Sequence, residues 1–291
     1  MRLIFLGSRG AQSVATLKTL LEHDLLPEAV LIEEEGGDPS VSQLALPVIG
    51  SSNAPGLPEI SAAHGVPAST VSRESLPRVL EVLRPGRVLV SCYPYRVPES
   101  LLCSMPSGWF NIHPSLLPDY RGPSPVFWQL RDGRDRIGVT LHRMSSELDL
   151  GPILAQRTFG LSDGSSMLSL SGQAGRVGAL LYLDLDSDAA TDTSPVQAQD
   201  PAKGSYQSFP RPEDFRIEPE WPALRVFNFI RGVRELGPPF FETESGRRCL
   251  IADALSWHDG PGPYPMNETR ENARLLRCYN GAVILHIEGY Q

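Results

Sequence analysis

Two polar side chains end an apolar run in FNIHPSLLPDYRG, residues 110–122. The run alternates in character, so a strand here would place Trp109, Asn111 and His113 on one face. Pro114 cannot continue an ordinary strand ladder, and the backbone must therefore turn directly after the histidine. Loops at strand ends often carry function. An isolated Asn and His are nevertheless more often hydrogen-bonded residues of the core than functional residues. Other residues must decide between a structural and a functional role.

A carboxylate follows the next predicted strand, IGVTLHRM at residues 137–144. Asp149 lies in the turn SSELDLGP, and we expect it at the same sheet edge as Asn111 and His113. A carboxylate favours the imidazolium form of a neighbouring histidine. An imidazolium and an amide aimed at one point can stabilise an oxygen that gains negative charge. Acyl transfer requires groups of this kind. The simpler alternative is that Asp149 only caps a turn.

The three residues suit direct transfer better than covalent catalysis. No activated serine or cysteine is apparent, so an acyl-enzyme has little support. Attack by an amine on an activated acyl donor needs only positioning, oxyanion stabilisation and proton removal. Asn111, His113 and Asp149 can supply these.

The elements that must position these residues alternate between strand and helix. Apolar runs predict strands and 3.6-residue spacing predicts helices. Strands are predicted at residues 2–7, 28–35, 87–95 and 137–144, and helices at 13–24, 75–86 and within 163–187. This order predicts an α/β fold, an open, mostly parallel, Rossmann-like sheet with helices on both faces, over residues 1–187.

The composition changes after this domain. Residues 188–204 are polar and rich in Pro, Thr and Ala, which predicts a linker. Beyond it, residues 222–233 have helical spacing, and residues 247–257, 274–281 and 282–290 read as short strands. We predict a small β-rich, barrel-like (OB-like) domain over residues 205–291.

Charge and composition exclude several classes of protein. The chain of 291 residues has a net charge of −8, and no Lys or Arg occurs from Thr19 to Ser72, which opposes nucleic-acid binding by that region. No apolar run approaches the roughly 18 residues of a membrane span. The four cysteines show no metal-ligand spacing. We therefore expect a cytoplasmic protein without a metal or a membrane partner.

The two motifs together resemble a known catalytic signature. FNIHPSLLPDYRGPSP with SSELDLGPIL is similar to the formyltransferases that use 10-formyltetrahydrofolate. This family includes methionyl-tRNA formyltransferase, glycinamide ribonucleotide transformylase and nucleotide-sugar N-formyltransferases. The stretches RPEDFRI, FNFIRGV and NGAVILHIE resemble the carboxy-terminal domain of the methionyl-tRNA and aminosugar enzymes, so the resemblance spans most of the chain.

The resemblance implies roles for individual residues. The family's catalytic Asn, His and Asp fall on Asn111, His113 and Asp149. The folate pocket, where backbone groups hold the pterin, falls on two loops made of Cys92, Tyr93, Pro94, Tyr95, Arg96 and Val97, and of Ser145, Ser146, Glu147 and Leu148. Substrate contacts are expected from Ser115, Leu116 and Arg121.

Several alternatives stay open at this point. Arg121 could bind an acceptor carboxylate or phosphate, or brace its loop. Trp128 is a core residue or borders the acceptor pocket. The turn GSRG at residues 7–10 lacks the pattern of a dinucleotide loop and reads as a plain strand-to-helix turn.

The acceptor is the main functional alternative. The base-free stretch favours a small-molecule amine, such as an aminosugar nucleotide or an amino-acid derivative, over tRNA. The within-family alternative is methionyl-tRNA formyltransferase, and the alternative of another class is a non-catalytic protein that binds folate or another ligand. A homodimer is compatible with the sequence.

Overall fold

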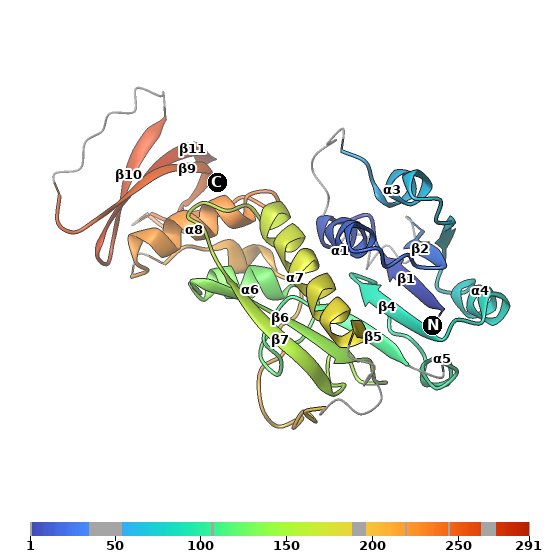
Figure 1. The fold of residues 1–291 in the computed structure, drawn as a ribbon. Coiled ribbons are helices and arrows are strands. Elements are labelled where there is room, and N and C mark those ends of the chain that lie inside the picture. Colours follow the sequence, from blue (N-terminus) through green and yellow to red (C-terminus); the bar gives the residue numbers. More distant parts are fainter. Residues whose placement is uncertain are drawn as a thin grey trace. The chain divides into compact units, whose positions relative to one another are not determined.

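The computed structural model (Figure 1) describes residues 2–34, 54–105, 108–187, 196–218, 220–243, 245–262 and 272–290. Contacts between Cα atoms divide the chain into two compact units. The first unit comprises Met1–Pro125, Ile137–Phe159 and Leu168–Ser208, and the second comprises Val126–Arg136, Gly160–Met167 and Phe209–Gln291.

The first unit is built on a seven-stranded sheet with the strand order β3-β2-β1-β4-β5-β6-β7. Its strands are β1 (Leu3–Gly7), β2 (Ala29–Glu33), β3 (Ala68–Val71), β4 (Arg87–Ser91), β5 (Trp109–His113), β6 (Arg136–Arg143) and β7 (Ile153–Gly160). Its helices are α1 (Ala11–Glu22), α3 (Leu57–Ala63), α4 (Leu76–Leu83), α5 (Glu99–Leu102) and α7 (Met167–Ser187). The pairs from β3 to β5 are parallel, which confirms the predicted α/β class.

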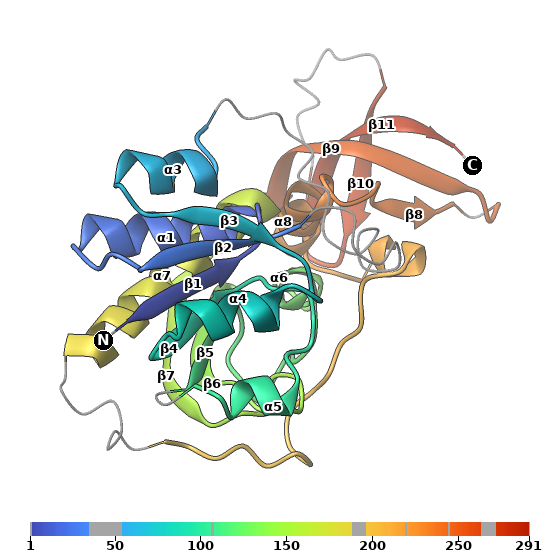
Figure 2. The same cartoon turned by 90° about the vertical axis from the view of Figure 1, so that its right-hand side faces the viewer.

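Alternation along the strands divides the core of this unit between two faces. One cluster joins Phe110 and Ile112 of β5 to α1, α3 and α7. The other joins Trp109 to α4 and α5, and Figure 2 shows α3 and α4 on opposite sides of the sheet. Asn111 and His113 share the face of Trp109, because side chains two residues apart on a strand point the same way.

The direction of β6 corrects one expectation. β6 pairs antiparallel with β5, with Phe110 opposite Arg143 and His113 opposite Thr140. The carboxyl end of β6 therefore lies beside the amino end of β5. The expectation that β5 and β6 both end at one sheet edge was wrong, although the Asp149 turn does reach His113 as expected.

The second unit contains α6 (Pro125–Arg131) apart from its first residue, the short 3₁₀ helix η1 (Pro212–Phe215) and α8 (Ala223–Val233). Its strands β8 (Phe240–Glu242), β9 (Arg248–Asp259), β10 (Ala273–Cys278) and β11 (Gly281–Tyr290) form one antiparallel sheet with the order β10-β11-β9-β8. Phe127 of α6 packs against Phe215 and Phe229 at centroid distances of 5.1 and 5.7 Å. The predicted β-rich second part is thus confirmed as a four-stranded sheet supported by α8.

The sequence pattern does not indicate α3, β3, α5, β7, η1 or β8. The first two lie at the end of a Gly-, Pro- and Ser-rich region without apolar periodicity, and residues 35–53 of this region lie outside the described residues. The boundaries of the predicted domains stay a prediction. Of the predicted linker, residues 188–195 lie outside the described part, and residues 196–204 belong to the first unit.

The back of β5 is in close contact with α7. A Cβ atom added to Gly178 would lie 2.2 Å from Cγ2 of Ile112, the residue between Asn111 and His113. An added Cβ at Gly172, in the same helix, would meet no atom within 4 Å. The strand that carries the two polar residues is thus held from behind by a glycine that leaves no room for a methyl group.

We predict that Gly178→Ala destabilises the protein by about 1–3 kcal/mol, because overpacking against Ile112 outweighs the better helix propensity of alanine. The matched control, Gly172→Ala, should be neutral or stabilising by up to about 1 kcal/mol. Urea unfolding measures both. Equal shifts of the two midpoints in one direction would contradict the close contact.

Candidate active site

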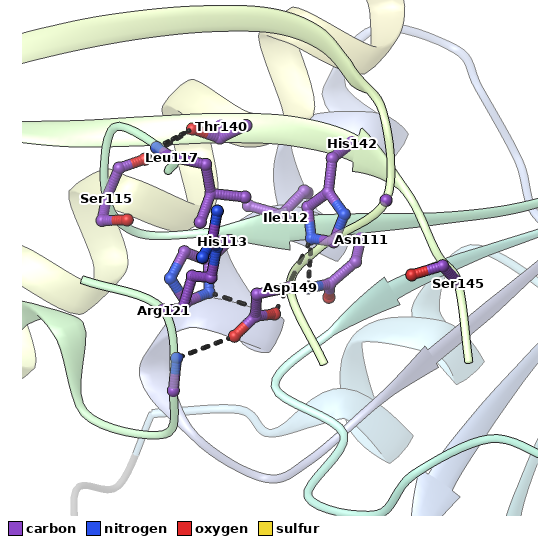
Figure 3. Close-up of polar contacts among 12 residues, drawn as sticks. Asn111, Ile112, His113, Ser115, Leu117, Arg121, Thr140, His142, Ser145 and Asp149 are labelled. Carbon is purple, nitrogen blue, oxygen red and sulfur yellow. Dashed lines mark hydrogen bonds and ion pairs between the residues drawn. The ribbon is translucent and has the colours of Figure 1, made fainter. Parts of the chain in front are cut away.

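Strand β5 presents the two polar residues of the predicted motif (Figure 3). His113 is 5% exposed and Asn111 is partly exposed. Phe110 and Ile112 anchor the opposite face of the same strand in the core. Apolar packing of Phe110 and Ile112 therefore holds the strand, and with it Asn111 and His113, in place.

The loop after β5 fixes the imidazole of His113. Its Nε2–H donates to the carbonyl oxygen of Tyr120 at 2.9 Å. A carbonyl only accepts, so this bond assigns a proton to Nε2 and leaves Nδ1 as the nitrogen that can take or release one. Nδ1 lies 3.6 Å from Oδ1 of Asp149. Proton exchange in this ring thus takes place on the side of the carboxylate.

Asp149 is buried, at 7% exposure, in a strained turn. Its φ of 56° lies in the left-handed region, which costs a non-glycine residue about 1–2 kcal/mol. Oδ2 accepts a hydrogen bond from the backbone N–H of Gly122 at 2.9 Å. The turn after β6 thus returns along the sheet and carries the carboxylate to His113, although the two strands run in opposite directions.

A second histidine, which the sequence reading missed, completes the cluster. His142 lies opposite Asn111 on β6 and is 2% exposed. Burial lowers its pKa to about 4, and the nearby Asp149 only partly offsets this effect. Nδ1–H donates to the carbonyl of Arg143 at 2.8 Å, so Nε2 of the neutral ring is an acceptor.

This neutral ring orients the amide of Asn111. Nδ2 of Asn111 lies 3.1 Å from Nε2 of His142 and donates to it. One amide hydrogen is used there and the other is left for a substrate oxygen. Periodicity alone could not show this contact, because it depends on the register between β5 and β6.

The predicted folate residues follow β4 and β6, the two strands that flank β5. Tyr93, the second residue of one segment, and Met144, the residue before the other, pack against the same core cluster as Trp109. Both segments therefore start on the face of the sheet that carries Asn111 and His113. The segment after β4 consists of Cys92, Tyr93, Pro94, Tyr95, Arg96 and Val97. The segment after β6 consists of Ser145, Ser146, Glu147 and Leu148.

The residues predicted to contact substrate differ in their surroundings. The Oγ of Ser115 donates to the carbonyl of Asp119 at 2.7 Å inside the loop, and Leu116 is 40% exposed. Arg121 is 7% exposed, and its Nε and Nη2 donate to Oε1 of Gln199 at 3.4 and 3.3 Å. These contacts favour the bracing role for Arg121, and its role in substrate binding stays a prediction.

Other kinds of site find no support in the described part of the chain. No group of three His, Cys, Asp or Glu residues there is arranged to hold a metal ion. In the same part, every helix is too short or too polar to cross a bilayer.

We predict that acid destabilises the protein partly through His142. The ring binds a proton near pH 6.5 in the unfolded chain but only near 4 in the folded protein. The unfolded state therefore binds more protons between these values, and the free energy of unfolding falls as the pH falls from about 6.5 to about 4. His142→Gln should reduce this loss in urea unfolding measured at pH 7.5 and 5.0. An unchanged pH dependence would mean that His142 is not buried in the neutral form.

Sequence comparison gives this cluster a context. Residues 47–173, which include Asn111, His113, His142 and Asp149, match the family model described as formyl transferase. The chain is 28% identical over 289 residues to a methionyl-tRNA formyltransferase from Trichlorobacter lovleyi, covering 98% of this chain and 88% of that protein.

Two solved structures share the fold. An N-formyltransferase from Helicobacter canadensis, in complex with folinic acid and dTDP-3-aminofucose, superimposes with a TM-score of 0.67 at 16% identity and covers 99% of this chain and 100% of its own. HypX from Aquifex aeolicus, in complex with tetrahydrofolic acid, gives 0.61 at 17% identity, and the chain spans only 43% of its length while 98% of this chain is covered. The resemblance predicted from the two motifs is confirmed, and the chain is a relative of the formyltransferases, enzymes that transfer formyl groups.

Proposed function

We propose that the protein is an N-formyltransferase that moves a formyl group from 10-formyltetrahydrofolate to the amine of a small molecule. The observation that carries this proposal is the buried contact between Nδ1 of His113 and Asp149, 3.6 Å apart, beside the oriented amide of Asn111. The contact lies within the region that matches the formyl transferase model.

The proposed reaction needs no covalent intermediate with the enzyme. The neutral amine attacks the formyl carbon and gives a tetrahedral intermediate. The free amide hydrogen of Asn111 donates to the oxyanion, and the positive charge of an imidazolium at His113 stabilises it further. Asp149 orients His113 and assists removal of the amine proton through water. The intermediate then collapses to the formamide: the bond between the formyl carbon and N10 of the folate breaks, and tetrahydrofolate leaves with a proton on N10, which replaces the proton lost by the amine.

The segments 92–97 and 145–148 would hold the folate. Pro94, Arg96 and residues 146–148 are exposed, whereas His113 and Asp149 beside them are buried. The exposed parts of both segments are thus available to a pterin next to the reacting residues. The relatives in complex with folinic acid and tetrahydrofolic acid support a folate cosubstrate.

A small amine is the acceptor that we favour. No Lys or Arg occurs from Thr19 to Ser72, and an acceptor arm of tRNA is held largely through phosphate contacts to cations. The complex of the H. canadensis enzyme with dTDP-3-aminofucose supports an aminosugar nucleotide.

Methionyl-tRNA is the second candidate acceptor. It is favoured by the T. lovleyi relative, which matches 98% of this chain. A role limited to binding folate is less well supported, because Asn111, His113 and Asp149 are all present and are connected by contacts that include His142. Burial of such polar groups costs free energy that binding alone does not require.

We predict that His113→Ala lowers kcat for formyl transfer by about two to four powers of ten. The variant loses the group that stabilises the oxyanion but none of the proposed folate segments, so folate affinity should change little. His64→Ala, which removes an exposed histidine at the end of α3, is the control and should retain normal activity. Near-normal turnover of His113→Ala at saturating substrates would make His113 a structural residue.

We predict transfer to a small amine and not to methionyl-tRNA. The test supplies 10-formyltetrahydrofolate with aminosugar nucleotides, with amino-acid derivatives and with charged initiator tRNA, and follows release of tetrahydrofolate. A kcat/KM for methionyl-tRNA near 10⁴ M⁻¹s⁻¹ or above, an ordinary value for a natural substrate, would overturn the choice of acceptor. No transfer to any acceptor would overturn the proposed function itself.

A further inference from the structure

Residues 197–207 lie beside two parts of the chain that are distant in sequence: the start of β7 and the loop after β5, which contains Arg121. Gln197 forms two backbone hydrogen bonds with Ile153, at 2.8 and 2.9 Å. At the other end, the N–H of Arg121 donates to Ser205 and the N–H of Gln207 donates to Arg121, at 3.0 and 2.9 Å. All these residues belong to the first unit. The segment is thus fixed at both ends beside the Asp149 turn.

Two glycines permit this close approach. A Cβ at Gly122 would lie 2.1 Å from the carbonyl oxygen of Gln207, and one at Gly204 would lie 2.1 Å from that of Pro118. Each glycine also has a positive φ, of 108° and 81° respectively. One glycine lies on each side of the contact, so both the loop and the segment are shaped for it.

Gln199 lies between the two fixed ends and uses its whole amide. Its Nε2 donates to the carbonyl oxygens of Asp149 and Gly151, at 2.8 and 2.7 Å. Its Oε1 accepts from Nε and Nη2 of Arg121. The N–H of Gly122, the residue after Arg121, donates to the carboxylate of Asp149. These bonds close a ring that contains Gln199, Arg121, Gly122 and Asp149.

The Asp149 turn needs such support from outside. Asp149 has a left-handed φ of 56°, which is less favourable than the right-handed region even though aspartate adopts it more readily than most residues, so hydrogen bonds to the turn help to hold it. At Gly151 an added Cβ would lie 1.7 Å from the carbonyl oxygen of Arg143, so the turn packs against the end of β6 too closely for any side chain at this position. The two carbonyls that Gln199 binds belong to Asp149 itself and to Gly151, so these bonds hold the part of the backbone that carries the carboxylate.

We propose that Gln199 is a positioning residue that acts through Asp149, holding its turn so that the carboxylate meets Nδ1 of His113. This inference rests on the proposed function and deepens it. The contact it controls is sensitive, because 3.6 Å separates the carboxylate from Nδ1 and a further displacement would remove it. A misplacement of about 1 Å at a reacting group can lower the rate by about a hundredfold.

Two substitutions separate the donor role from the acceptor role of the Gln199 side-chain amide. Gln199→Leu removes all its hydrogen bonds at similar volume. Gln199→Glu keeps an acceptor for Arg121 but sets a carboxylate oxygen against the carbonyls of Asp149 and Gly151. We expect both to lower kcat about ten- to a hundredfold while KM for folate and for acceptor changes less than about threefold. Gln173→Leu, on the exposed side of α7, is the matched control and should leave kcat unchanged.

The deciding experiment is a double-mutant cycle with Asp149→Asn, measured as kcat with the best amine acceptor and with 10-formyltetrahydrofolate. If Gln199 acts through the carboxylate, Gln199→Leu should cost less than about twofold once Asp149→Asn is present, because the group that it positions is gone. Multiplicative losses in the double variant would overturn the inference and make Gln199 a general support of the fold. Normal kcat in the single Gln199→Leu variant would also overturn it, leaving the proposed function intact. Absence of transfer by the parent protein would overturn the proposed function, and the role of Gln199 with it.

Discussion

A carboxylate that is almost fully removed from water is the constraint on which the site depends. Burial of a charged group costs several kcal/mol unless partners compensate for it. Asp149 finds its partners in different parts of the chain: the N–H of Gly122 and the ring of His113. His142 also lies near, at 3.9 Å, but its low pKa leaves it neutral, so it does not compensate the charge. The loop after β5 and the turn after β6 must therefore close on each other for the carboxylate to be buried at all.

Strand β5 links the stability of the first unit to its chemistry. Phe110 and Ile112 are held in one core cluster, and Trp109 in the other. Asn111 lies between Phe110 and Ile112, and His113 directly follows Ile112. Rigid elements position reacting groups more accurately than loops do. The cost of burying polar groups here is met by apolar packing on both faces of a single five-residue strand.

The sequence predicts the part of this arrangement that local patterns determine. Alternation in WFNIH placed Asn111 and His113 on one face, and the strand-helix order gave the α/β class. The sequence does not predict the direction of β6, because a strand has the same alternating pattern whether its neighbour is parallel or antiparallel. His142 was missed for the same reason, since its contact with Asn111 depends on the register of that pair.

Long-range hydrogen bonds explain the remaining difference. Residues 196–204 have the composition of a linker, and nothing periodic in them indicates that Gln199 meets a turn 50 residues away. The same contact bears on Arg121. Its guanidinium looked suited to an anionic acceptor, but its Nε and Nη2 already donate to Gln199 and to the carbonyl of Asp200. Turning Nε and Nη2 towards a phosphate would break the ring of bonds that holds the Asp149 turn. Recognition of the acceptor is therefore better assigned to groups outside this ring, so that the geometry of the reacting residues does not change with the acceptor that is bound.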